Sequence, residues 1–150
     1  MSLQIGWDFS KPLKNQFVQS ALTARWSSVN FIESSRSLVP RGRGVYIVSV
    51  CSDVSTGVQP FCNFETPAYV GISKNLWQRF GTHTGSNDDN ALWRQLFNFR
   101  NHTKFWFAEF PDFSSSDLRV IEQSLINTYG SPLNKINSVR IGKPISAATN

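Results

Sequence analysis

The chain has 150 residues, of which 13% are aromatic and only 17% are charged. Because disordered chains combine few aromatic residues with much charge, this composition excludes a fully disordered protein, and the length predicts one compact domain with a sizeable core. Fifteen Lys and Arg against ten Asp and Glu give a net charge of +5, which is compatible with a phosphate-rich partner but does not identify one.

Neither a targeting segment nor a disulfide framework is expected. The first residues lack the charged and apolar regions of a signal peptide, and the longest apolar stretch, around Val45 to Cys51, is too short to span a bilayer. We therefore expect a soluble, cytoplasmic protein without a membrane partner. The two cysteines, Cys51 and Cys62, fit reduced thiols, and no Cys/His cluster has the spacing of a zinc site.

Residues 1–40 are predicted to form a helical extension. Apolar side chains recur at roughly helical spacing between residues 13 and 35, and Pro40 and Gly42 then break this pattern. The extension would precede the main domain.

Two strands come next. Residues 44–51 (GVYIVSVC) are rich in β-branched side chains and predict a mostly buried strand, and residues 67–72 predict a second, shorter strand. The pair predicts an antiparallel hairpin. The insertion between the strands, residues 51–66, is either a loop that contacts the substrate or mere decoration.

Three helices and one strand complete the predicted order. Ser73 is suited to cap a helix that runs to about Gly81, and a second helix is expected over residues 90–99. Residues 104–110 predict the third strand. The pattern Ser114-x-x-Asp117 then resembles a capping box that opens a helix ending at Tyr129, before Gly130.

Two of these helices carry polar side chains that are candidates for catalysis or metal binding. Glu122 projects about 40° from Leu118, inside the apolar stripe of its helix. A carboxylate in that position reaches solvent, pairs with an Arg or binds a metal ion. Arg79 and His83 are four residues apart and share one helix face, where a solvated Arg and a structural His are the ordinary outcomes.

Five segments in register resemble the motifs of the GIY-YIG endonucleases. They are Gly44-Val45-Tyr46, Tyr69-Val70-Gly71, residues 75–83 (NLWQRFGTH), residues 121–126 (IEQSLI) and Pro132-Leu133-Asn134. Each segment alone is weak evidence, whereas their shared order and spacing are specific. The resemblance implies an α+β fold in which helices flank a small three-stranded antiparallel sheet. The GIY-YIG-like domain would span residues 41–140, followed by a C-terminal tail at 141–150.

The resemblance also implies an activity. It points to a DNA endonuclease that hydrolyses a phosphodiester bond with one divalent cation, Mg²⁺ or Mn²⁺, held by Glu122 together with waters and substrate oxygens. Arg79 would stabilise charge on the phosphate. Tyr46 is the favoured base that activates the water, although a phenol with an ordinary pKa near ~10 needs nearby positive charge to act at neutral pH. His83, with an ordinary pKa of about 6.5, is the competing base.

The remaining candidate residues would position the reacting groups or bind nucleic acid. Tyr69 would position the water or the phosphate, and Asn134 would brace the site, with Asn137 as a weaker candidate for that place. The residues expected to contact nucleic acid are Arg43, Lys74 and Arg79.

Three functions stay open at this stage. An active endonuclease is favoured because every polar motif position holds a competent side chain. The alternatives on the same fold are a catalytically inactive nucleic-acid-binding domain and a protein-interaction module. A monomer and a homodimer are both compatible with the sequence, as are roles in repair, restriction or mobile elements.

Overall fold

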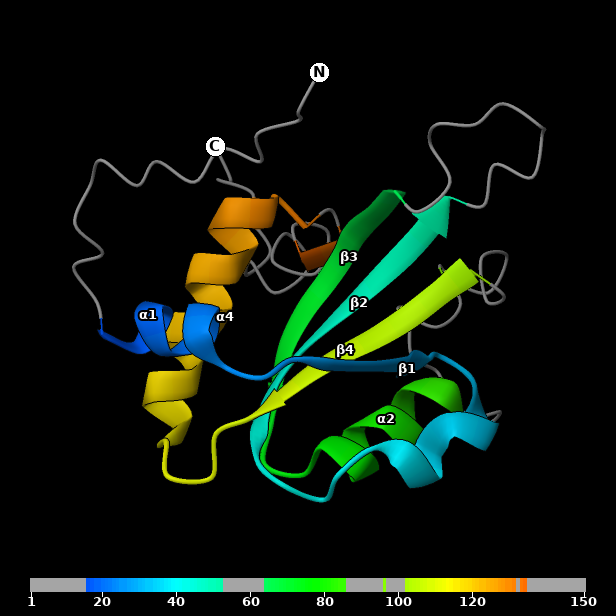
Figure 1. Cartoon of the computed structure of the whole chain (residues 1–150), viewed down its shortest axis with the longest axis horizontal. Helices are drawn as coiled ribbons and strands as arrows, with labels where there is room; N and C mark the ends of the chain where they lie inside the picture. The colour runs from blue at the N-terminus through cyan, green and yellow to red at the C-terminus, as the bar shows by residue number, and fades with distance from the viewer. Residues whose placement is uncertain (1–15, 53–63, 86–95, 97–101, 132, 135–150) are drawn as a thin grey trace, which may run out of the picture.

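The computed structural model describes residues 16–52, 64–85, 96, 102–131 and 133–134, and its centre is a four-stranded antiparallel sheet. The elements in chain order are α1 (Gln16–Thr23), β1 (Ser27–Asn30), the 3₁₀ helix η1 (Glu33–Leu38), β2 (Gly44–Ser52), β3 (Phe64–Ser73), α2 (Leu76–Thr84), β4 (Thr103–Glu109) and α4 (Ser115–Tyr129). The strands follow the order β1-β4-β2-β3. Helices α1 and α4 cover one face of the sheet, and η1 and α2 lie on the other (Figure 1).

The predicted α+β architecture is confirmed, but the prediction of three strands is wrong. Helix α1 ends at Thr23, and residues 27–30, which lie within the predicted helical segment 13–35, form β1 and pair with β4. Residues 27–30 carry only one β-branched side chain, Val29, so they give no local strand signal. The strand forms because β4 offers an unpaired edge whose backbone groups need partners.

Strand β2 divides the core into two clusters. Tyr46 and Val48 face η1 and α2, whereas Val45 and Ile47 face α1 and α4. A strand buried on both faces reads as an almost continuous apolar run, which is why the sequence 44–51 predicts it so clearly. The predicted hairpin is also confirmed, because β2 pairs with β3 in antiparallel fashion with one register shift between Val48 and Ser49.

Capping residues determine where the two longer helices begin. The predicted capping box of α4 is present: the Ser114 and Asp117 side chains bond each other's backbone N–H, and Gly130 ends the helix at a φ of 63°. Helix α2 begins later than predicted. Its N-cap is Asn75, whose side chain accepts a hydrogen bond from the backbone N–H of Gln78, while Ser73 stabilises the preceding turn.

Some predicted segments lie outside the described residues. These are most of the expected helix over residues 90–99, most of the insertion at 51–66, and the tail at 141–150. Among the residues that the structure describes, no helix is long and apolar enough to cross a membrane.

Candidate active site

Two tyrosines and a histidine meet on the α2 side of the sheet. Tyr46 comes from the central strand β2, Tyr69 from the edge strand β3, and His83 from the last turn of α2. The hydroxyl oxygen of Tyr46 lies 2.9 Å from Nε2 of His83, a hydrogen-bond distance. The Tyr69 ring centroid is 6.0 Å from that of Tyr46 and 6.3 Å from that of His83. Residues 46, 69 and 83 therefore form one cluster.

Gly71 makes room for the Tyr46 side chain. The two residues are partners in the β2–β3 register, and a Cβ atom on Gly71 would lie 2.5 Å from the Tyr46 hydroxyl. The Tyr46 ring also stacks on Phe105 of β4, with ring centroids 4.9 Å apart. The phenol is thus held between a bare backbone and an aromatic ring, and only 2% of the residue is exposed.

Burial controls the ionisation of Tyr46. It raises the pKa of this phenol well above its ordinary value, and the neighbouring Tyr69 and the charge of Glu122 act in the same direction. Arg79 acts in the opposite direction, as the sequence argument for a tyrosine base requires, but its effect is smaller than that of burial. The protein groups alone therefore keep Tyr46 protonated at neutral pH.

His83 is an uncharged imidazole at neutral pH. Burial lowers its pKa to about 4, and the positive charge of Arg79 contributes to this shift. The ring is only 5% exposed and meets Phe31 edge-on at a centroid distance of 6.4 Å. A neutral imidazole keeps one ring nitrogen able to accept a proton.

Among the described residues, Glu122 and Arg79 are the charged side chains that act electrostatically on this cluster. Arg79 is exposed on α2, one turn before His83, and Glu122 is partly buried on α4. Burial raises the pKa of the Glu122 carboxyl, and only Arg119 opposes this shift. Within the described residues the Glu122 carboxylate makes no hydrogen bond or ion pair, and no three His, Cys, Asp or Glu side chains group as metal ligands.

Asn134 closes the free edge of the sheet beside Tyr69. Its side-chain oxygen accepts a hydrogen bond from the backbone N–H of Val70 at 2.8 Å, and its amide donates one to the Val70 carbonyl at 2.8 Å. This side chain therefore replaces the missing strand next to β3 at one residue. Asn137, the weaker candidate, lies outside the described residues.

The three predicted contacts to nucleic acid lie in two places. Lys74 and Arg79 line the same cavity between the first turns of α2 and α4. Arg43 does not line that cavity. Its guanidinium donates a hydrogen bond to the backbone carbonyl of Phe113 at 2.6 Å and thereby holds the connection between β4 and α4.

Comparison with known proteins identifies the family of the chain. Residues 44–137, more than half of the chain, match the family described as the GIY-YIG catalytic domain. The chain belongs to the GIY-YIG family. No curated protein matches its sequence significantly.

Three solved structures are similar to the chain. They are point mutants of the GIY-YIG N-terminal endonuclease domain of UvrC from Thermotoga maritima, each bound to its catalytic divalent cation. Each has a TM-score of 0.42 and covers 66% of this chain and 89% of the other, with 15% identity for two of them and 16% for the third.

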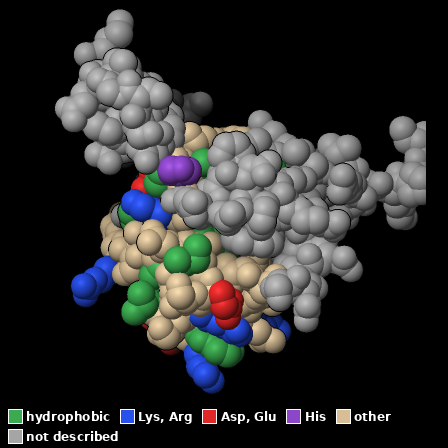
Figure 2. All heavy atoms as spheres, turned by 90° about the vertical axis from the view of Figure 1, so that its right-hand side faces the viewer, with side chains coloured by type: hydrophobic (Ala, Val, Ile, Leu, Met, Phe, Trp, Pro, Cys, Tyr) green, Lys and Arg blue, Asp and Glu red, His purple; other side chains and the backbone are tan. Residues whose placement is uncertain are grey.

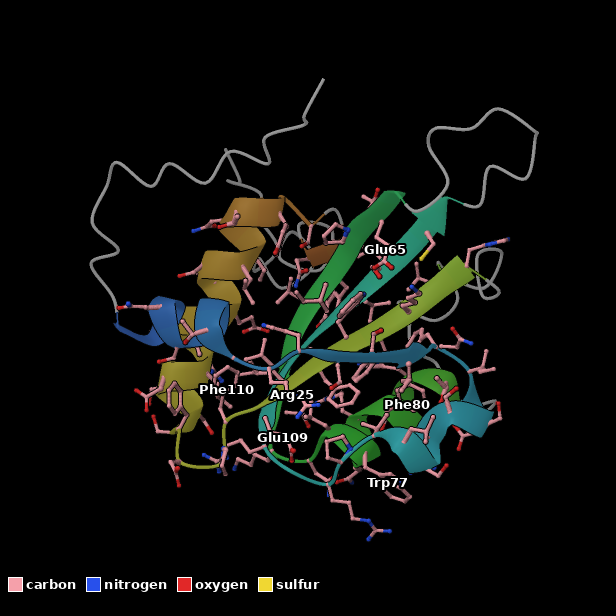
Figure 3. All side chains as sticks on the ribbon, in the orientation of Figure 1. Arg25, Glu65, Trp77, Phe80, Glu109 and Phe110 are labelled. Carbon is pink, nitrogen blue, oxygen red and sulfur yellow. The ribbon has the colours of Figure 1, made fainter. Side chains whose placement is uncertain are left out.

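Sequence reasoning missed that residues before the GIY-YIG match support α2. Thr84 donates a hydrogen bond from Oγ1 to Oε2 of Glu33 at 2.5 Å, and Glu33 also pairs with Arg36 at 3.1 Å. The Arg36 guanidinium lies 3.7 Å from the Trp77 ring centroid. Trp77 points away from the sheet while Phe80 points toward it (Figure 3). No local sequence signal predicts these contacts.

The outer surface near η1 and α2 carries both charge and apolar area. Arg41 also lies over Trp77, at 4.4 Å from the ring centroid. In the space-filling view, Lys and Arg side chains in blue lie against hydrophobic side chains in green at the lower end of the visible face (Figure 2). Arg36 and Arg41 cover the partly exposed Trp77 ring, which is a packing role.

Proposed function

We propose that this GIY-YIG domain is a metal-dependent DNA endonuclease that hydrolyses a phosphodiester bond. The observation that carries the proposal is the 2.9 Å contact between the Tyr46 hydroxyl and Nε2 of His83, with Arg79 and Glu122 as the charged side chains that act electrostatically on Tyr46. A buried phenol in contact with a neutral imidazole is a pair that can move a proton at neutral pH.

Glu122 is the proposed metal ligand. Its carboxylate is partly buried and has no ion-pair partner among the described residues, so a bound cation would compensate its charge. A single carboxylate with waters and substrate phosphate oxygens is a common way to hold Mg²⁺, and Mn²⁺ accepts the same oxygen ligands. When bound there, the cation supplies Lewis acidity for the phosphate and for the departing 3′ oxygen.

Tyr46 and His83 are proposed to share the work of the general base. As water attacks phosphorus and the bond from phosphorus to the 3′ oxygen breaks, Tyr46 accepts the water proton at its hydroxyl oxygen and passes its own proton to Nε2 of His83, while the departing 3′ oxygen takes up a proton from solvent. The phenol then never has to exist as a free phenolate, which burial makes unfavourable. This scheme unites the two candidates that the sequence presents as competitors.

The other residues bind the phosphate or hold the reacting groups in position. Arg79 is exposed on α2, one turn before His83, and its planar guanidinium can contact two phosphate oxygens. Tyr69 orients the water or the phosphate from the edge strand, and Asn134 keeps that edge in place through its two hydrogen bonds to Val70.

The test is cleavage of supercoiled plasmid by the wild type and by Glu122→Gln, each with Mg²⁺, with Mn²⁺ and with EDTA. We expect metal-dependent nicking by the wild type and none by the variant, because the amide keeps the shape of the side chain and loses its charge. Glu109→Gln is the matched control, since Glu109 is exposed at the end of β4.

Two outcomes would contradict the proposal. Full activity of a folded Glu122→Gln variant would remove the metal mechanism. A wild type that binds DNA and never cuts it, with either metal, would instead support the inactive nucleic-acid-binding domain.

A further inference from the structure

A second polar feature adjoins the proposed active site. It is a cavity of about 450 Å³ between the first turn of α2 and the first turn of α4. Its walls include Lys74, Gln78 and Arg79 from the α2 side and Ser115 and Arg119 from α4. This volume falls within the range of roughly 300–1,000 Å³ that is typical of ligand pockets.

The cavity is suited to an anion. Three cationic side chains line it, and none of its described lining residues is a carboxylate. A second cavity, lined in part by α1 and α4, is different in kind, because it is lined by Trp26 and Trp106 and contains the carboxylate of Glu65, labelled in Figure 3. Lys104 and Trp106 already donate hydrogen bonds to the Glu65 carboxylate. The second cavity therefore contains a paired carboxylate, whereas the first is lined by cationic side chains and, among its described lining residues, by no carboxylate.

Arg119 connects the first cavity to the proposed active site. It precedes Glu122 by three residues on α4, so the two side chains lie on adjacent turns of one helix face. On the other wall, Arg79 lines the cavity and also influences Tyr46 and His83. One wall of the cavity is therefore linked to the cluster through Arg79, and the other wall is linked to Glu122 through Arg119.

We infer that this cavity binds a backbone phosphate of the DNA strand next to the scissile phosphate, and that Arg119 and Lys74 are its contacts. The inference rests on the proposed function, because it takes the scissile phosphate to lie at Arg79 and Glu122. Arg119 stands outside the motif segments, so the site extends the phosphate-binding surface beyond them. Its neighbours Gln78 and Ser115 add polar groups for the same phosphate.

The experiment measures binding without chemistry. A fluorescein-labelled DNA duplex is titrated by anisotropy, in EDTA, with the Glu122→Gln protein and with the same protein carrying Arg119→Gln, Arg119→Lys or Lys74→Gln. Each measurement is repeated between about 50 and 200 mM salt, a range over which phosphate contacts change affinity strongly. Arg25→Gln is the matched control, because Arg25 is exposed and does not line this cavity.

We expect Arg119→Gln and Lys74→Gln each to weaken binding and to lower the slope of log K against log salt by about one, the value for one lost phosphate contact. Arg119→Lys should keep the slope because it keeps the charge, and Arg25→Gln should change neither quantity. Thermal melting of all variants should match that of the parent. In the active protein, Arg119→Gln should raise KM more than it lowers kcat.

The two proposals fail in different ways. An unchanged affinity and slope for Arg119→Gln, with a parent that binds DNA, would overturn the phosphate site alone. Inorganic phosphate could also compete with the labelled duplex as well as unlabelled DNA does at the same concentration of phosphate groups. That result would overturn the phosphate site too, because it would show a site for free anions. A wild type that shows no metal-dependent cleavage would contradict only the proposed function. Absence of DNA binding by the parent and by every variant would overturn both proposals.

Discussion

At the scale of single residues, burial sets the protonation of the Tyr46–His83 pair. Both side chains lie in the aromatic cluster that contains Phe31, Phe80 and Phe105, where little water is available to stabilise a charge on either one. The phenol keeps its proton and the imidazole stays neutral. Tyr46 can therefore donate a proton, and a ring nitrogen of His83 can accept it.

Tyr46→Phe should separate catalysis from folding. The change removes one hydroxyl and leaves the ring to stack on Phe105 and to lie over Gly71. We expect DNA binding to persist and turnover to fall by about 10² to 10⁴-fold, the usual value of general-base assistance. Single-turnover cleavage and a binding titration check this. Near-normal cutting by Tyr46→Phe, with a His83→Ala variant inactive at every pH, would transfer the base role to His83 alone.

His83 should make the fold less stable in acid. Its pKa is about 4 in the folded state, against about 6.5 in an unfolded chain, so the unfolded state binds more protons between these values. The free energy of unfolding therefore falls as the pH drops through this window, by roughly 3 kcal/mol in total. Urea unfolding at pH 7 and at pH 4.5 measures the loss. His83→Gln, which does not titrate, should lose less stability than the wild type, and an identical loss would contradict the buried neutral imidazole.

At the scale of elements, η1 and the turn after it hold helix α2. The backbone N–H groups of Leu76 and Trp77 donate to the carbonyls of Gly42 and Pro40, which satisfies two groups of the first helical turn. At the other end, the Thr84 hydroxyl donates to Glu33. Helix α2 is thus anchored at both ends, and Arg79 and His83 lie between these anchors.

Thr84→Val should loosen the end of α2 that carries His83. The variant keeps the shape of this buried side chain and removes the hydrogen bond to Glu33, which costs about 0.5–1.5 kcal/mol of stability. We expect kcat to fall while KM stays the same, because His83 is displaced and the phosphate contacts are not. Thr84→Ser is the control and should keep kcat. Equal kinetics for the valine variant and the wild type would show that this hydrogen bond does not position His83.

At the scale of the whole molecule, the segment before residue 41 completes the domain. Strand β1 pairs with β4, and Phe31, which is fully buried, stacks on Phe105 and meets Phe80. The segment therefore supplies one edge of the sheet and part of the core on the α2 face, although it lies outside the match to the GIY-YIG family.

A chain that begins at Arg41 should fail to fold cooperatively. The deletion exposes the edge of β4 and uncovers Phe80 and Phe105, which leaves an apolar surface and an unpaired strand edge. We expect loss of a cooperative thermal transition by circular dichroism, together with aggregation. A chain that begins at Gln16 keeps every described element and is the control. A cooperative transition in the shorter chain would show that residues 41–150 are independent of the segment.

Local sequence patterns predict the features that depend on neighbouring residues. The β-branched run of residues 44–51 predicts β2 because a strand buried on both faces must be apolar on both. The capping box at Ser114 and Asp117 predicts the start of α4 because a helix start needs acceptors for its free N–H groups. The spacing of Arg79 and His83 places them on one helix face in the same way.

Features that depend on residues far apart in the chain arise only when the chain is folded. Strand β1 exists because β4, more than seventy residues later, has an edge to pair. The pKa shifts of Tyr46 and His83 follow from desolvation by side chains of separate elements, including Phe80 of α2 and Phe105 of β4. Arg119 meets the wall of α2 only because the two helix starts lie together. Burial and edge pairing are properties of the assembled chain, so no local pattern encodes them.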